Sequence, residues 1–145
     1  MRIRTKFLLV GLLFLLVWPS VGFTGNIVGM PGRFLPVLES IEINGSSFTS
    51  DIVYIGDAQG IFSLQYDISG GGTVKLEYLI SLDETNYIEP SSASDIATGL
   101  TASSGPGGDG QDIVSFTPIL GEYLKIRATE SDASATTVTV YLGRQ

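Results

Sequence analysis

The chain contains no cysteine and no histidine, and these two absences exclude most familiar catalytic and zinc-binding chemistry. Ser-His-Asp and Cys-His nucleophiles cannot be built without them, and neither can the usual zinc sites. The absence of cysteine also means that no disulfide stabilises the fold and that no thiol can carry a lipid anchor. Stability must therefore come from packing, from partners or from bound cations.

Basic residues are scarce as well. Eight Lys and Arg stand against 15 Asp and Glu, which gives a net charge of −7. Three of the eight (Arg2, Arg4 and Lys6) lie at the extreme N-terminus, so a chain that begins at Phe23 has a net charge of −10. Such a chain repels nucleic-acid phosphates and anionic lipids. We expect no nucleic-acid partner, and membrane contact only through an uncleaved N-terminal segment.

The first 22 residues have the composition of a secretory signal peptide. A basic start precedes an apolar run from Phe7 to Trp18, and Pro19 then separates this run from the small residues Ser20 and Gly22. The run is short for a membrane span. We expect cleavage after Gly22 and a secreted location, extracellular or periplasmic, by bacterial-type export; a retained anchor is the alternative.

Residues 23–37 form an apolar arm that glycine and proline interrupt. One interpretation is that the arm adds a strand to the sheet of a neighbouring copy, and the other is that it packs across its own domain. Its candidate assembly residues are Phe23, Ile27, Val28, Phe34, Leu35 and Val37.

Residues 38–145 alternate apolar and polar residues in the way that half-buried strands do. The pattern is clearest at 62–68, 74–80, 124–128 and 138–142, and weaker strands are expected at 40–44, 48–55 and 113–117. Glycine-rich turns separate these segments, and no helical periodicity occurs. The sequence predicts an all-β fold, a single antiparallel β-sandwich of the jelly-roll or Ig-like kind with seven or eight strands. Residues 89–104 are expected to form a long connection between the sheets.

Paired carboxylates are the one enzymatic arrangement that this composition still allows, as in glycosidases. The candidate acids are Glu77, Asp83, Glu84 and Glu122, but 15 acids on a small domain fall near one another by chance. We expect solvated charges rather than an enzyme.

Calcium is the one cofactor that the composition allows, because it prefers carboxylate and carbonyl oxygens on loops. The candidate ligands are Asp57, Asp83, Asp109 and Asp112, which have no EF-hand spacing. Aspartate is also an ordinary turn residue, so the same positions are expected in turns without any metal.

Exposed aromatic rings on strands and loops are the usual platform for glycans. The only tryptophan, Trp18, lies in the predicted signal peptide, so tyrosines must supply any platform. The best candidates are Tyr87, Tyr123 and Tyr141. The alternative is that these rings cover neighbouring strands.

Several segments between residues 60 and 142 resemble small uncharacterised β-sandwich proteins of bacterial and phage or prophage sequences. They are LISLDETNYIEP, SGPGGDGQD, SFTPI, GEYLKIRATE and TTVTVYLG. The resemblance implies a surface-associated or particle-associated module for binding or assembly, and it supplies no catalytic residues.

Three functions follow as hypotheses. The first is a structural subunit of an extracellular layer, filament or appendage, whose partner is another copy of the chain. The second is a module that binds a surface glycan or protein through loop tyrosines. The third is a hydrolase that uses a carboxylate pair.

Overall fold

The computed structural model describes residues 34–58, 60–91 and 94–144. The predicted signal peptide, its cleavage site and arm residues Phe23, Ile27 and Val28 lie outside the described residues. Within them, no helix is long and apolar enough to cross a membrane.

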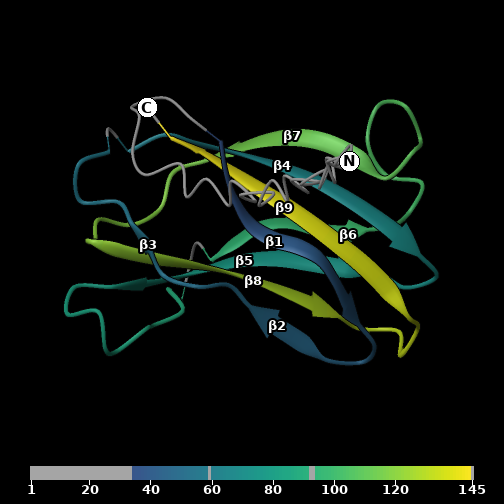
Figure 1. Ribbon diagram of the computed structural model, residues 1–145, viewed down its shortest axis with the longest axis horizontal. Helices are drawn as coiled ribbons and strands as arrows, with labels where there is room; N and C mark the ends of the chain where they lie inside the picture. Colours follow the sequence, from purple (N-terminus) through teal and green to yellow (C-terminus); the bar gives the residue numbers. More distant parts are fainter. Residues whose placement is uncertain (1–33, 59, 92–93, 145) are drawn as a thin grey trace, which may run out of the picture.

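The described residues form nine strands and no helix, in two antiparallel sheets (Figure 1). One sheet has the order β1-β9-β4-β7, with β1 at Phe34–Ile43, β9 at Thr136–Arg144, β4 at Phe62–Gly70 and β7 at Gln111–Phe116. The second has the order β2-β8-β5-β6, with β2 at Ser47–Thr49, β8 at Tyr123–Glu130, β5 at Val74–Ser81 and β6 at Asp95–Leu100. A short β3, Val53–Tyr54, also pairs with β8. The all-β prediction is confirmed, and the arrangement is consistent with a sandwich.

The core comes from the alternating strands that the sequence singles out. In β4 the apolar residues Phe62, Leu64, Tyr66 and Ile68 are buried while the residues between them are more exposed. The same alternation holds in β8 and β9. Full burial of one such side chain contributes about 1.5–3 kcal/mol, so these three strands supply much of the stability.

The connection expected over residues 89–104, in place of a central strand, is wrong for Asp95–Leu100, which form β6. β6 is an edge strand that pairs with β5 through two register irregularities. Edge strands tolerate residues that a central strand would reject, and Gly99 adopts a φ of 70° within β6. Leu100, at the end of β6, is buried in the core and so packs this edge strand against the rest of the domain.

Two other boundaries differ from expectation. The strand expected at 48–55 is divided into β2 and β3, because the Ser50 hydroxyl accepts the Ile126 backbone N–H (3.0 Å) in place of a backbone carbonyl. β1 begins at Phe34, so the expected boundary at residue 38 falls inside this strand. Phe34 and Leu35 are exposed, whereas Val37 packs against the core.

A buried carboxylate fastens the loops at one end of the molecule, which we call the polar end. Glu130 accepts backbone N–H groups from Gly45 (2.5 Å), Asp132 (2.6 Å) and Ser134 (3.3 Å). These bonds, chiefly the one from Gly45, hold the pKa of Glu130 below its usual range. The polar end consists of loops 44–46, 71–73, 101–110 and 131–135.

Candidate functional site

At the opposite end of the molecule, the left end of the ribbon in Figure 1, several apolar residues are exposed. Leu120 is 91% exposed and Leu82 is 74% exposed, although both lie in loops that border the core. We call this surface the apolar end and define it by Tyr54, Ile61, Leu82, Ile119 and Leu120, all of which are exposed.

Backbone hydrogen bonds hold the segments of the apolar end together. The Ile55 N–H donates to the Glu122 carbonyl (2.8 Å), and the Glu122 N–H donates to the Ser81 carbonyl (3.0 Å). The Arg144 guanidinium donates to the Tyr54 carbonyl (2.7 Å), which ties the end of β9 to the other sheet. The exposed side chains therefore stand on an ordered framework. The sequence analysis did not identify this surface, although Ile119 and Leu120 lie in a loop with no alternating pattern.

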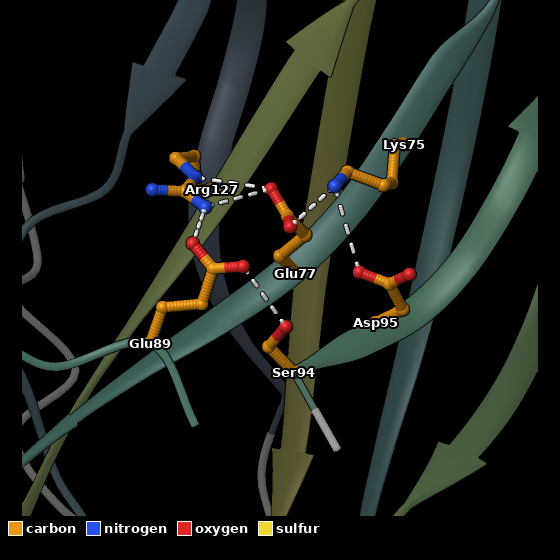
Figure 2. A network of polar contacts seen from close by, with 6 residues as sticks. All are labelled: Lys75, Glu77, Glu89, Ser94, Asp95 and Arg127. Atoms are coloured by element: carbon orange, nitrogen blue, oxygen red, sulfur yellow. Dashed lines mark hydrogen bonds and ion pairs between the residues drawn. The ribbon is translucent and has the colours of Figure 1, made fainter. Parts of the chain in front are cut away.

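A second feature is a network of charges on the outer face of the five-stranded sheet (Figure 2). Glu77 occupies an outward position of β5, yet its side chain is only 1% exposed. The Arg127 Nε donates to Glu77 Oε2 (3.0 Å), and the Lys75 Nζ lies 2.5 Å from Glu77 Oε1 as an ion pair that lacks hydrogen-bond geometry. The network is completed by Glu89, Ser94 and Asp95.

Glu77 is the only acid of this network that the sequence analysis considered for a carboxylate pair, and it lies between Lys75 and Arg127. A general acid must keep its proton near neutral pH, which requires a raised pKa. Arg127 instead donates a hydrogen bond to Glu89 and holds the pKa of that carboxyl below its usual range. The other candidate acids, Asp83, Glu84 and Glu122, lie in the exposed loops beside the apolar end. The ion pairs hold Glu89 against β8 and Asp95 against β5.

The tyrosines predicted as a ligand platform separate into two places. Tyr123 packs edge-on against Tyr54, with ring centroids 5.7 Å apart. Tyr87 lies near Tyr123, and the Lys125 Nζ sits 4.3 Å from the centre of the Tyr87 ring. Tyr141 lies on β9 of the other sheet, opposite Pro36 and Gln65.

Tyr87 is the most constrained of these tyrosines. Its hydroxyl is inaccessible to solvent and has no hydrogen-bond partner among the described residues. Burial, followed by the nearby charge of Glu84, raises the pKa of Tyr87. We call Tyr54, Tyr87, Tyr123 and Lys125 the tyrosine patch. It borders the apolar end through Tyr54, which the two surfaces share.

The four candidate calcium ligands lie in different local settings. Asp57 forms an ion pair with Arg144 (3.2 Å). Asp83 accepts the N–H groups of Asn86 (2.8 Å) and Thr85 (3.0 Å), and these bonds hold its pKa below the usual range. Asp109 and Asp112 accept backbone N–H groups from residues one or two positions ahead. In ranges 34–58, 60–91 and 94–144, no three acidic side chains gather in a way that could hold a metal ion.

Comparison with known proteins does not assign the chain to a group. A scan against known protein families finds no match, and a search of curated proteins finds no significant relative.

Proposed function

We propose that this protein is an exported, non-catalytic structural module whose copies associate through the apolar end. The observation that carries the proposal is the concentration of exposed apolar side chains on one ordered end of the molecule. Apolar surface exposed in this way on a soluble protein is a common mark of an interaction site. The opposite end, by contrast, is made of glycine, serine and acidic loops.

Association through the sheet edges is less well supported than association through this end. β1 and β6 both carry register irregularities, and β2 and β3 are only three and two residues long. On β7, the Ile113 N–H donates to Asp112 Oδ1 (2.7 Å) and is not free for a neighbour. Bulges, short strands and occupied donors are the features by which edge strands avoid pairing.

The test is the mass of the purified protein in solution, measured by light scattering over a range of concentrations. We expect a multiple of the chain mass, and we expect Leu82→Asp and Leu120→Asp to convert it to the monomer. Ile113→Asp is the matched control, because it charges an exposed isoleucine on β7, away from the apolar end. A monomer at every concentration would contradict the proposal.

Salt gives the same measurement a second readout. Copies with a net charge of −7 or below repel one another, and added salt screens this repulsion. We therefore expect association through apolar contacts to strengthen as salt is raised. Weakening by salt would indicate that ion pairs, rather than apolar side chains, form the interface.

The tyrosine patch supports glycan binding as a second candidate function. Tyr54 is exposed and braced by Tyr123, so its ring is available for stacking on a sugar. Tyr54→Ala should abolish saturable binding on a glycan array, whereas Tyr141→Ala, on the other sheet, should preserve it. Equal binding by both variants would exclude the patch as the site.

A further inference from the structure

We infer that the apolar end binds residues 23–33 of a second copy, so that two copies exchange their N-terminal arms. This inference rests on the proposed function, because it names the partner of the same surface. It differs from a direct contact between two apolar ends, and the tests below separate the two.

The first argument is the place where the chain enters the fold. β1 starts at Phe34, opposite Gly143 near the end of β9, and finishes at Ile43, opposite Thr136. β1 therefore runs from the apolar end toward the polar end (Figure 1). Phe34, the first residue that the structure describes, therefore lies at the apolar end.

The second argument is the composition and reach of residues 23–33. This segment, FTGNIVGMPGR, contains Phe23, Ile27, Val28 and Met30 and no acidic residue. Eleven residues span up to about 36 Å when extended, which is long enough to cross the end of a small domain. Its apolar side chains match the chemistry of Leu82 and Leu120, which need a covering surface.

The third argument is charge. All 15 acidic residues fall between residues 34 and 144, together with only four basic ones. Asp57, Asp83, Glu84 and Glu122 lie in the loops around the apolar end. Two such ends placed face to face would bring like charges together, which costs free energy. The arm carries a single charge, that of Arg33, which is opposite in sign to these acids.

Arm exchange of this kind produces a closed dimer. Phe34, to which the arm is joined, and the surface that receives the arm lie at the same end of each copy, so two copies can receive each other's arms around one twofold axis. Such an interface is self-complementary and leaves no second surface for growth. We therefore expect a dimer whose mass stays constant as concentration rises, rather than an open-ended polymer.

The absence of cysteine makes a direct test clean, because every introduced thiol is unique. Two single variants, Val28→Cys and Leu120→Cys, are exported from the host, purified, checked for the arm by intact mass, and mixed. A short bis-maleimide crosslinker is then added, since it tolerates an unknown register. We expect a crosslinked dimer that contains one chain of each variant. Ser103→Cys, in an exposed loop at the polar end, replaces Leu120→Cys as the control and should give no such product.

Light scattering on Val28→Asp supplies the second measurement. The arm precedes the described strands, so circular dichroism should be unchanged while the dimer becomes a monomer. A dimer that survives this change and gives no mixed crosslink would overturn arm exchange but leave association through the apolar end intact. A doubly substituted chain, Val28→Cys with Leu120→Cys, that crosslinks only within itself would show that the arm covers its own end. Cleavage beyond Val28, or a monomer in every sample, would also overturn the inference, and the latter would refute the proposed function as well.

Discussion

Replacing Arg127 by methionine should destabilise the protein far more than replacing the glutamate that it contacts. Arg127→Met would leave Glu77, which is 1% exposed, without its two contacts from Arg127. Breaking a buried ion pair from one side costs about 3–5 kcal/mol. Because Lys75 stays beside Glu77 and Arg127 is itself 24% exposed, we expect about 2–3 kcal/mol. For a domain of this size that lowers Tm by about 8–12 °C.

Replacing Glu77 instead of Arg127 leaves each basic residue with another carboxylate partner. In Glu77→Leu, Arg127 retains Glu89, and Lys75 retains Asp95. Both remaining pairs are partly exposed, and partly exposed charges lose little when a neighbour is removed. We expect a cost of about 1 kcal/mol or less, since a leucine fills most of the vacated volume.

The double variant, Glu77→Leu with Arg127→Met, completes the test. Replacing a buried ion pair by apolar side chains of similar volume is often neutral or stabilising, so its stability should lie within about 1 kcal/mol of the parent. The assay is urea denaturation followed by circular dichroism, with m-values compared to verify two-state behaviour. Two single variants of equal cost, or a double variant that adds both costs, would refute the view that an unpaired buried carboxylate causes the loss.

Three further predictions concern the ends of the molecule. Because backbone N–H groups lower the pKa of Glu130, its stabilising effect is present above about pH 4.5 and is lost as pH falls through the folded-state pKa; Glu130→Gln should flatten this acid decline in urea midpoints. Gly72→Ala would bring a methyl group within 2.6 Å of Thr136 Oγ1, and should cost about 1–3 kcal/mol, whereas Gly71→Ala, with ordinary contacts, should cost less. Intact mass of the exported protein should show a chain that starts at Phe23; an unprocessed N-terminus would favour the retained anchor.

The alternation of apolar residues predicted the central strands because, in such strands, every second side chain is buried in the core. β4, β5, β8 and β9 all lie between two other strands, where inward and outward residues differ most. β6 was missed because residues of an edge strand alternate less strictly between apolar and polar. Gly99 and the register irregularities of β6 interrupt the alternation further.

The burial of Glu77 could not be predicted from local pattern. Its position in β5 is outward, and it is buried among partners that lie far from it in sequence or come from other elements, with Ile88 and Ser94 bonded to the edge of β5 through Ile80 and Tyr78. The same pairing of Ile88 with Ile80 brings Tyr87 near Tyr123. The apolar end escaped notice for a related reason, since its residues come from β3 and from separate loops that meet only when both sheets have formed.

The position of β9 within its sheet has a consequence for the order of folding. Among the described strands β9 comes last in sequence, yet it lies between β1 and β4 and is the only one of them that joins β1 to that sheet. Nascent chains are made from the N-terminus onward, and contacts between distant residues form late. The four-stranded sheet therefore cannot form completely until Thr136–Arg144 have been synthesised.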